Sequence, residues 1–366
     1  MIDLNVSVPG GSYPVMIEAG LFPQIGERLK DIHGGRHGLV VFDDKVRPLH
    51  GQSLMEGFSS EWNMQAVDLE ASEASKRLET VGGLLDDCLV AGLDRGGLIA
   101  AVGGGITGDV AGFVAASYMR GISLVQIPTT LLAMVDASVG GKTGVNLPLP
   151  DGGGIGKNLA GAFWQPEAVL MDPLVLKTLD QRELRCGLGE CIKHAMIADP
   201  SMLDLIESDR VGILAAEPDC LERLIHQAVQ IKISVIENDE RESGVRASLN
   251  LGHTFAHAIE PIGSLDLRHG EAVAIGLVAA ATCALELGMI EVDRVDRMRS
   301  IIELVGLPSR LSSPIPAAQL IQTMRFDKKA HDGQLRLVLP DSNGVSIHDD
   351  VPMDVVQRAW EVVGAV

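Results

Sequence analysis

The sequence predicts an N-terminal α/β domain, residues 1–172, followed by a mainly α-helical domain, residues 173–366. In the first part, short runs rich in β-branched residues alternate with helical patterns, which is typical of a largely parallel sheet covered by helices. In the second part, helical periodicity dominates. The length of 366 residues allows two domains with a core each, and a composition of 46% hydrophobic and 22% charged residues is typical of a soluble globular protein.

The charge and the cysteines restrict the class of protein. A formal net charge of -19 argues against a general surface for nucleic acids or anionic membranes, so an anionic ligand would need a local basic pocket. The first residues lack the basic and apolar segments of a secretory signal. The five cysteines are scattered and form no C-x-x-C pair, which favours reduced thiols in the cytoplasm over disulfides or a zinc knuckle.

The chain opens with two short strand patterns, residues 4–8 and 14–18, which predict a hairpin. Residues 38–44 form a buried strand pattern that ends in Asp43 and Asp44. In an α/β sheet, ligand-binding loops follow the carboxyl ends of the strands. The two aspartates could therefore accept hydrogen bonds from ribose hydroxyls, or they could simply cap a turn.

A glycine-rich turn follows the next buried strand pattern, residues 98–102. Gly103, Gly105 and Gly108 satisfy G-x-G-x-x-G between this strand and a predicted helix. Glycines there let a pyrophosphate approach the backbone and the N–H groups of a helix N-terminus. No acidic residue follows in a second strand about 20 residues on, so the turn predicts a dinucleotide or phosphate site that differs from a standard first-unit Rossmann domain.

Residues 140–143, GGKT, look like the end of a P-loop. The spacing fails because Asp136 stands where that motif requires its first glycine, which argues against nucleotide hydrolysis. Lys142 could still hold an anion as a point charge. Residues 147–156 are rich in proline and glycine and predict a linker or an inserted loop.

The second half of the chain carries three notable helical features. Glu190, Lys193 and His194 would lie on one face of a helix, either as surface ion pairs or, given their small and apolar neighbours, in the interior. Residues 272–285 form the longest apolar run, which is shorter than the roughly 20 residues that span a bilayer and predicts a buried helix. Residues 325–339 predict a short hairpin.

Three of the ten histidines lie within residues 253–269. His253 and His257 are four residues apart and would point from one face of a helix, and His269 follows after a break. Neutral imidazole is a common ligand of zinc, and a catalytic zinc site uses about three protein ligands with one position left open. The pattern predicts a metal site, although two hydrogen-bonded core histidines would give the same spacing.

Seven separated stretches together resemble the 3-dehydroquinate synthase family, in the order of that family and over roughly residues 40–340. They are GGGITGDVAGFVAASYMRGI, QIPTTLLAMVDASVGGKTGVN, GKNLAGAFWQP, GLGECIKHAMI, LNLGHTFAHAIE, RHGEAVAIG and DKK. The resemblance implies a Rossmann-like NAD-binding α/β domain and a helical domain that binds metal and substrate. It also implies a homodimer.

The resemblance assigns a role to each part of the histidine cluster. Glu190, His253 and His269 fall on the positions of the family's metal ligands, which hold Zn²⁺ or Co²⁺. His257 then becomes a proton-transfer residue on the substrate side, and Glu242 matches a further position of that kind.

The remaining site residues are also implied by the resemblance. The NAD site would be lined by Asp44, Glu73, Lys76, Gly105, Ile106, Thr107, Gly108, Asp109, Thr129, Thr130, Lys142, Lys157 and Thr178. Lys142, Lys157 and Asn158 would lie between nucleotide and substrate. The substrate's carboxylate and phosphate would be held by Arg120, Asp136, Lys193, Lys232, Arg246, Asn250 and one lysine of the pair Lys328 and Lys329. The loop at residues 147–156 is a few residues longer than the family pattern.

The implied reaction converts 3-deoxy-D-arabino-heptulosonate 7-phosphate, a phosphorylated keto-acid sugar, into 3-dehydroquinate and phosphate. Zinc has no accessible redox couple, so the metal can polarise a hydroxyl while NAD takes the hydride. Oxidation of the C5 alcohol acidifies the adjacent C–H, phosphate leaves, the ketone is reduced again, and an aldol step closes the ring.

Three alternatives compete with this interpretation. A metal-dependent polyol or glycerol-phosphate dehydrogenase would release NADH and would need fewer cations. A related sugar-phosphate cyclase would act on another phosphorylated sugar, and retention of Lys193, Arg246 and Asn250 favours the carboxylate-bearing substrate instead. A non-catalytic NAD-binding protein would not need all of the proposed ligands and proton-transfer groups.

Overall fold

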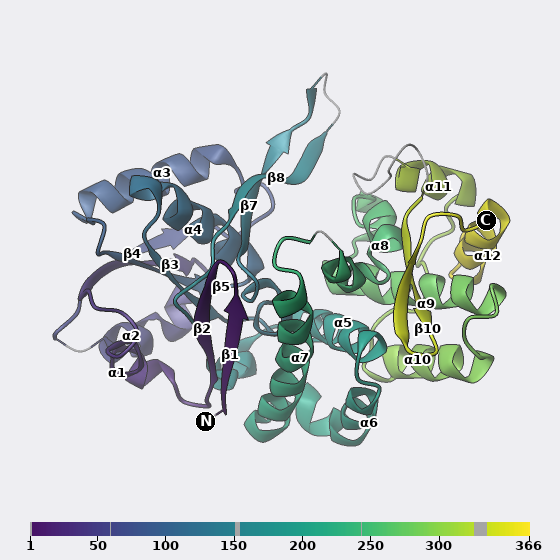
Figure 1. Cartoon of the computed structure of the whole chain (residues 1–366), viewed down its shortest axis with the longest axis horizontal. Helices are drawn as coiled ribbons and strands as arrows, with labels where there is room; N and C mark the ends of the chain where they lie inside the picture. The colour runs from purple at the N-terminus through teal and green to yellow at the C-terminus, as the bar shows by residue number, and fades with distance from the viewer. Residues whose placement is uncertain (1, 59, 151–153, 243, 326–334) are drawn as a thin grey trace. The chain divides into compact units, whose positions relative to one another are not determined.

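The computed structural model describes residues 2–58, 60–150, 154–242, 244–325 and 335–366. The contacts divide the chain into two compact units (Figure 1). The first unit comprises Met1–Leu179 and Ala216–Arg241, and the second comprises Asp180–Ala215 and Glu242–Val366. A parallel sheet with helices in the first unit and a mainly helical second unit confirm the predicted fold class.

The first unit is built on a seven-stranded sheet with the order β1-β2-β9-β6-β5-β3-β4. Its strands are β1 (Ile2–Val8), β2 (Gly11–Ile17), β3 (His37–Asp43), β4 (Asn63–Leu69), β5 (Leu98–Gly103), β6 (Ser123–Pro128) and β9 (Ala168–Met171). Only β1 pairs antiparallel, with β2, so the predicted opening hairpin is confirmed. The other pairs are parallel, and β5 is buried along its whole length, as expected for a strand covered on both faces.

Helices cover this sheet. They are α1 (Ile25–Leu29), α2 (Arg47–Gly57), α3 (Leu78–Val90), α4 (Gly105–Ser117) and α7 (Pro218–Asn238), with short turns η1 (Phe22–Gln24), η2 (Tyr118–Arg120), η3 (Ala133–Ala137) and η5 (Pro173–Thr178). Alternate residues of β3 and β5, among them Leu39, Val41 and Ile99, form one core with Val110 and Val114 of α4. This alternation places one face of the central strands against α3 and α4.

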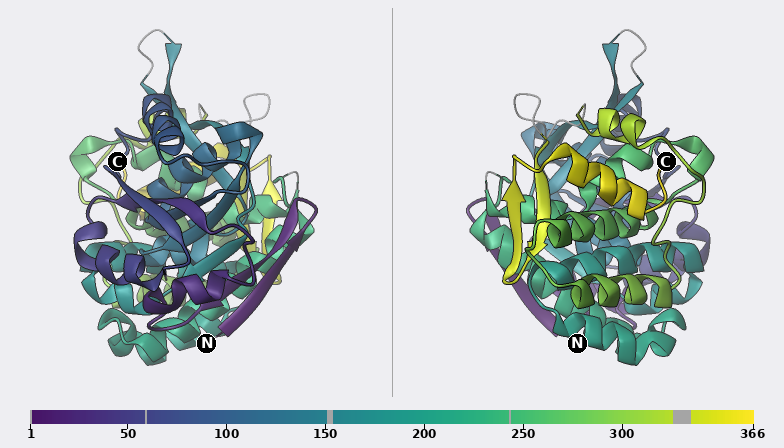
Figure 2. Two further views of the ribbon diagram at one scale, coloured as in Figure 1. Left: turned by 90° about the vertical axis from the view of Figure 1, so that its left-hand side faces the viewer. Right: turned by 90° about the vertical axis from the view of Figure 1, so that its right-hand side faces the viewer.

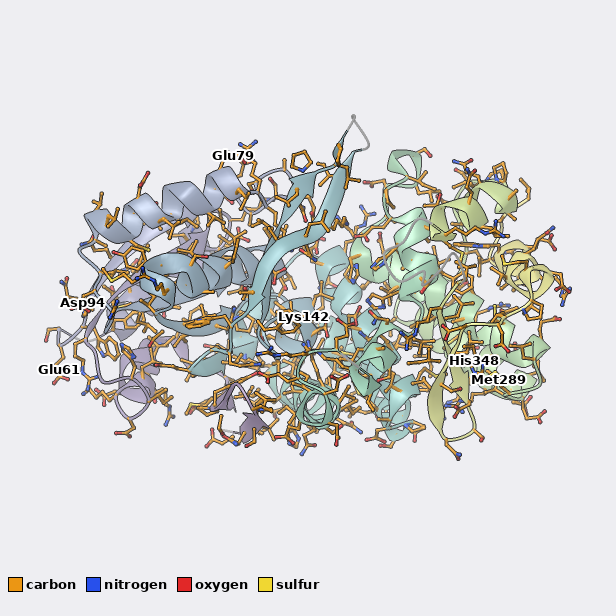
Figure 3. All side chains as sticks on the ribbon, turned by 45° about the horizontal axis from the view of Figure 1, so that its top comes forward. Glu61, Glu79, Asp94, Lys142, Met289 and His348 are labelled. Atoms are coloured by element: carbon orange, nitrogen blue, oxygen red, sulfur yellow. The ribbon has the colours of Figure 1, made fainter. Side chains whose placement is uncertain are left out.

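A separate hairpin joins β7 (Lys142–Pro148) to β8 (Ile155–Phe163), with a register shift between Val145 and Leu147. It occupies the segment in which the sequence predicts a linker or insertion. Lys142 begins β7 (Figure 3). Residues 151–153 lie outside the described residues.

Helix α7 belongs to the first unit although it follows two helices of the second unit in the chain. Figure 1 shows it beside β1. Glu237 and Glu240 accept hydrogen bonds from the backbone N–H groups of Ser7 and Gly10, at 2.9 and 3.1 Å. The units therefore differ from the division expected after residue 172, because Glu237 of α7 and Glu240 just after it accept hydrogen bonds from the hairpin at the start of the chain, more than 200 residues earlier.

The second unit surrounds one central helix, α9 (His269–Glu286). Its other elements are α5 (Gln181–Ile197), α6 (Ser201–Leu214), η6 (Val245–Asn250), α8 (His253–Ile259), η7 (Gly263–Leu265), α10 (Val292–Leu304), α11 (Ala317–Arg325), β10 (Leu337–Asp341), β11 (Gly344–His348) and α12 (Met353–Val362). Both β10 and α12 pack on α9 (Figure 2). A hairpin of β10 and β11 lies at 337–348, and Arg325, where the predicted hairpin would begin, ends helix α11. Residues 326–334, most of the segment predicted as a hairpin, lie outside the described residues.

Helix α9 confirms the buried helix predicted from the apolar run. By length and composition alone it could cross a membrane, and 78% of its apolar window is buried inside the structure. Residues from Ala272 to Ala284 are all buried, on every side of the helix. This is the pattern of a core helix.

Candidate functional site

Close contact between helices brings the predicted metal ligands together in the second unit. A Cβ atom added to Gly270 would lie 2.1 Å from the carbonyl oxygen of Cys186, and one added to Gly189 would lie 2.7 Å from the carbonyl oxygen of Gly270. Helices α5 and α9 therefore touch through their backbones. Because Glu190 and His269 directly adjoin these glycines in sequence, the crossing places the two side chains side by side.

A second close contact adds His253. A Cβ atom on Gly276 of α9 would lie 2.2 Å from the carbonyl oxygen of Gly252. Gly252 has a φ of 76°, in the left-handed region that favours glycine, and it is the N-cap of α8. His253 is the next residue, so this turn aims it toward α5 and α9.

The three side chains form a compact group of possible ligand atoms. His253 Nε2 lies 3.7 Å and His269 Nε2 lies 3.4 Å from Glu190 Oε1, and the ligand atoms of the three residues all lie within 4.8 Å of one another. Two ligands of one tetrahedral zinc ion are about 3.4 Å apart. Two imidazole nitrogens and one carboxylate oxygen at these separations match the donor set of a catalytic zinc or cobalt site.

The orientation of His253 supports the same arrangement. Its Nδ1 lies 3.2 Å from the carbonyl oxygen of Leu251, which leaves Nε2 as the nitrogen that faces Glu190. A metal-ligating histidine usually donates its other N–H to such an acceptor. His257 stands beside His253, with ring centroids 5.6 Å apart, and does not belong to the group of ligand atoms.

The possible metal ligands lie among charged side chains that shift one another's pKa. Lys193, one helical turn after Glu190, forms an ion pair with it, and both side chains are buried. Burial and the nearby Lys193 ammonium lower the pKa of His253, which favours the neutral ring that binds metals. Burial also opposes the charge on His269, but hydrogen bonding to Glu190 and Glu260 raises its pKa to about 10. A divalent cation held by Glu190, His253 and His269 would supply positive charge in place of that proton.

Three predicted site residues, the substrate-binding Arg246 and Asn250 and the proton-transfer residue Glu242, lie in the short segment before α8. Asn250 donates a hydrogen bond from Nδ2 to Glu242 Oε1 at 2.9 Å. Arg246, on η6, is almost fully buried at 1% exposure, and η6 packs on α5. The structure therefore gathers these residues next to the helix that carries Glu190 and Lys193. Lys328 and Lys329 lie outside the described residues.

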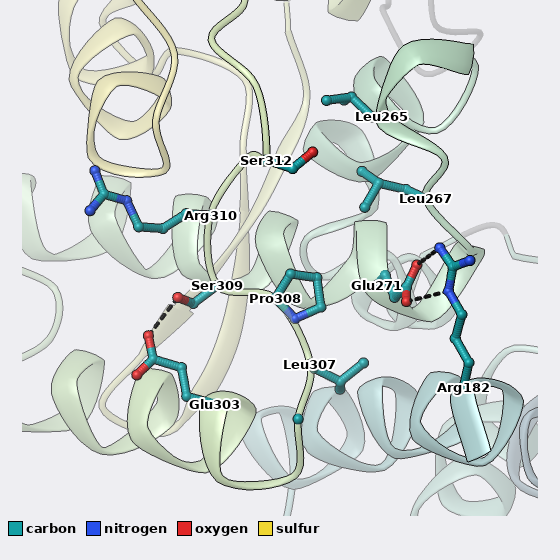
Figure 4. Close-up of a pocket in the computed structure, with 11 residues that line it drawn as sticks. Arg182, Leu265, Leu267, Glu271, Glu303, Leu307, Pro308, Ser309, Arg310 and Ser312 are labelled. Atoms are coloured by element: carbon teal, nitrogen blue, oxygen red, sulfur yellow. Dashed lines mark hydrogen bonds and ion pairs between the residues drawn. The ribbon is translucent and has the colours of Figure 1, made fainter.

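An arginine clamp ties the starts of α5 and α9 together (Figure 4). Arg182 donates from Nε and Nη2 to the two carboxylate oxygens of Glu271, at 2.7 and 2.8 Å. Its Nη1 donates to Asp266 Oδ2 at 3.0 Å. A cavity of about 580 Å³ lies beside the clamp, lined among others by Leu265 and Leu307. None of the described residues that line this cavity was predicted as a residue of the metal, nucleotide or substrate site.

The first unit carries the predicted nucleotide residues at one edge of its sheet. The parallel register pairs Phe42 with Val102 and Gly103 with Pro128, so β3, β5 and β6 end at the same edge. Asp44, the glycine turn that opens α4, and Thr129 with Thr130 follow these strand ends. This is the edge at which α/β sheets bind ligands.

The glycines of the turn have different structural roles. A Cβ atom on Gly103 would lie 2.4 Å from Thr107 Oγ1, and one on Gly108 would lie 2.7 Å from Gln126 Oε1. Both positions pack α4 closely on the strands. Gly104 is the N-cap of α4, and Gly105 is its first residue. The first N–H groups of a helix have no acceptor within the helix, so those of α4 are available to bind an anion. Thr129 Oγ1 is buried here and, within the described part of the chain, has no hydrogen-bond partner, which suits a site that a nucleotide hydroxyl or phosphate completes.

A polar network joins this edge to the hairpin β7–β8. Lys76, nearly buried, forms an ion pair with Asp109 Oδ2 at 2.5 Å. Burial raises the pKa of Asp109, and the Lys76 ammonium opposes that rise. Asn146 donates to Glu73 Oε2 at 2.8 Å and accepts from the backbone N–H of Asn158 at 2.9 Å. Asn146 was not predicted as a site residue, although a polar residue inside an apolar strand is the sequence signal for such a role.

Four further predicted residues of this unit are Asp136, Lys232, Thr178 and Arg120. Asp136 of η3 and Lys232 of α7 form an ion pair at 2.8 Å, and Thr178 accepts a hydrogen bond from His50 at 2.7 Å if Nε2 of that ring carries the proton. Arg120 lies between the end of α4 and the start of β6. It therefore lies at the amino edge of the sheet, opposite the glycine turn. The structure does not bring Arg120 to the other predicted site residues of the first unit.

Known proteins match this chain over almost its whole length. The family model described as 3-dehydroquinate synthase N-terminal matches residues 66–186, and the one described as 3-dehydroquinate synthase C-terminal matches residues 187–330. The chain is 39% identical over 363 residues to 3-dehydroquinate synthase of Nostoc punctiforme, with 98% of each chain covered. It is 43% identical to that of Pseudomonas entomophila, covering 98% of this chain and 96% of the relative.

Solved structures show the same architecture. The 2-epi-5-epi-valiolone synthase of Streptomyces hygroscopicus, solved with NAD⁺ and Zn²⁺ bound, superposes with a TM-score of 0.87 at 28% identity over 98% of both chains. A probable glycerol dehydrogenase of Sinorhizobium meliloti, with a TM-score of 0.66 at 15% identity over 95% of both chains, shares the fold alone. On the family models and the long, 39–43% identical relatives, the chain belongs to the 3-dehydroquinate synthase family.

Proposed function

We propose that the chain is a phosphate-eliminating lyase that converts 3-deoxy-D-arabino-heptulosonate 7-phosphate into 3-dehydroquinate and phosphate. The observation that carries this proposal is the convergence of Glu190 Oε1, His253 Nε2 and His269 Nε2 beside Lys193 in a chain of this family. Removal of the elements of phosphoric acid from this substrate gives the product. The reaction therefore needs no net oxidant, and NAD serves as a cofactor that is restored in each turnover.

The metal site would consist of Glu190, His253 and His269. A bound Zn²⁺ or Co²⁺ would polarise the substrate hydroxyls and lower their pKa. Lys193 and the segment with Arg246 and Asn250 would bind the substrate carboxylate and so fix the sugar relative to these ligands. His257, beside His253 but outside the ligand group, would exchange a proton with the substrate. Glu242, which accepts from Asn250, would take part in the same proton transfer.

The nucleotide would bind at the carboxyl edge of the first unit's sheet. When bound there, NAD would accept and return one hydride. The first turn of α4 would receive the pyrophosphate at its N–H groups. Asp44 would accept hydrogen bonds from the ribose, and the network of Glu73, Lys76 and Asp109 would hold the loop between β4 and α3 in position.

Lys76→Met is expected to weaken NAD binding by about tenfold or more and to destabilise the protein by about 3 kcal/mol, because it leaves the buried Asp109 without its cation. Calorimetric titration with NAD and thermal unfolding measure the two effects. The double variant Lys76→Met/Asp109→Asn should recover stability but not NAD affinity. Lys177→Met, at an exposed position of the same unit, is the control. Unchanged NAD affinity in Lys76→Met would show that this network does not support the nucleotide site.

Arg246→Lys is expected to raise KM for the heptulosonate phosphate by about 10- to 100-fold, because lysine keeps the charge but loses the paired N–H groups of a guanidinium. Arg297→Lys, at a surface ion-pair position of the same unit, should leave KM unchanged. Steady-state kinetics with both variants measure the effect. A wild-type KM in Arg246→Lys would remove Arg246 from the substrate site.

The proposal is tested most simply by substrate choice. The wild-type protein, with NAD and Zn²⁺ or Co²⁺, should release phosphate from the heptulosonate phosphate and form a product that a 3-dehydroquinate standard identifies. A phosphorylated ketose without a carboxylate should be a poor substrate. The opposite preference would indicate a related sugar-phosphate cyclase.

We also propose that the protein acts as a homodimer. The position of Arg120 supports this, because an arginine at the amino edge of the sheet cannot join the nucleotide edge of its own unit and could instead serve the site of a second copy. Light scattering should then give a mass about twice the 38.8 kDa of the chain. A monomer with full activity would contradict this part of the proposal.

We place the protein in the cytoplasm. All five cysteines are free thiols in the structure, and four of them are buried. Such cysteines are typical of a reducing compartment. The net charge of -19 also supports a small-molecule partner over nucleic acids or membranes.

A further inference from the structure

Both ring nitrogens of His269 face carboxylates that come from different helices. Its Nε2 lies 3.4 Å from Glu190 Oε1. Its Nδ1 lies 3.6 Å from Glu260 Oε1. Glu260 is the C-cap residue of α8, and His269 is the first residue of α9. The ring thus spans the gap between the ends of these two helices.

The two histidines of the metal group are arranged in the same way. Each presents Nε2 to Glu190 Oε1, and each has an acceptor behind its Nδ1. For His253 this acceptor is the carbonyl oxygen of Leu251, and for His269 it is Glu260. An acceptor in this position fixes which nitrogen carries the proton and holds the ring toward the metal.

His269 depends on such an acceptor more than His253 does. The side chain of His269 is 32% exposed, against 11% for His253, so fewer neighbours restrict rotation of its ring. The Arg182 clamp holds the backbone at the start of α9 through Glu271 and Asp266. The hydrogen bonds of this clamp do not include the imidazole, whose Nε2 side faces Glu190 and the ring of His253, so that Glu260 is the group that faces its Nδ1 side.

We propose that Glu260 is a positioning residue of the metal centre, which accepts the Nδ1–H of His269 and thereby increases the affinity of the site for a divalent cation. This inference rests on the proposed metal centre. Glu260 would act on the metal through His269 and would not itself be a ligand.

The test is a metal titration of the full-length protein after removal of all metal. Wild type, Glu260→Ala and Glu260→Gln are titrated with Zn²⁺ in competition with a chromophoric chelator, and with Co²⁺ while its visible absorption is recorded. We expect Glu260→Ala to bind Zn²⁺ about 10- to 100-fold more weakly. Glu260→Gln should fall between, since its amide oxygen still accepts a hydrogen bond but carries no charge. The Co²⁺ spectrum should change in both variants, because it reports the geometry of the ligands.

Glu286→Ala is the matched control, because it removes a carboxylate from the far end of α9, where Glu286 pairs with Arg358 on the surface. Its metal affinity should equal that of wild type. Wild-type affinity and an unchanged Co²⁺ spectrum in Glu260→Ala would overturn the inference while the metal centre stands. If the alanine variant does not fold, unchanged values in Glu260→Gln would overturn it equally. A wild-type protein that binds no divalent metal would instead refute the proposed metal centre.

Discussion

Replacing His253 by alanine is expected to reduce phosphate release by a factor on the order of 10³. Electrostatic stabilisation by a bound metal contributes several kcal/mol to a reaction of this kind, and about 1.4 kcal/mol corresponds to a tenfold change in rate. His253 supplies one of the three side chains of this ligand group and is nearly buried, so its removal would leave the metal with two of its three proposed ligands. The bound metal after dialysis and the rate of phosphate release measure the effect.

His348→Ala is the control for this experiment. His348, labelled in Figure 3, is a half-buried histidine of the same unit, on β11. Its Nε2 lies 3.0 Å from Ser346 Oγ. Its removal should leave metal content and rate near those of wild type. If His253→Ala kept its metal and more than about a tenth of the wild-type rate, the assignment of the ligands would be wrong.

Replacing Gly270 by alanine is expected to lower both stability and metal affinity. The added Cβ would lie 2.1 Å from the carbonyl oxygen of Cys186, which is a backbone atom and cannot rotate away. Helices α5 and α9 would have to separate, at a cost of about 1–3 kcal/mol or more. Ligands of a metal must be held within about 0.5 Å of the productive geometry, so this separation would also move Glu190 away from His269. Thermal unfolding with and without Zn²⁺ measures the two losses.

Gly263→Ala is the matched control, because a Cβ atom at Gly263 would have no heavy atom within 4 Å. Its stability should stay within about 0.5 kcal/mol of wild type. If Gly270→Ala behaved in the same way, the close helix crossing would not be what positions the ligands.

The sequence alone predicts the elements whose signal is local. The apolar run in residues 272–285 predicts α9 because every face of that helix is buried. The glycine turn predicts the junction of β5 and α4 because both the strand and the helix adjoin it. By contrast, the membership of α7 in the first unit rests on contacts with distant segments, among them β1, β2 and η3, which no local pattern contains.

The same distinction applies to the candidate site. The spacing of His253, His257 and His269 indicates a metal site but does not show which rings face Glu190. That choice depends on the left-handed turn at Gly252 and on the close contact of α8 and α9 at Gly276. The sequence predicts neither the turn nor the contact, because Gly252 and Gly276 belong to different elements that only folding brings together.

We propose that NAD is reduced and reoxidised within each turnover. The most direct test supplies the heptulosonate phosphate in large excess over NAD, with metal present, and follows phosphate release and NADH absorbance in the same sample. We expect many phosphate molecules to be released per NAD, with no steady accumulation of NADH. Accumulation of NADH without phosphate release would rule out this internal redox cycle and would identify a dehydrogenase.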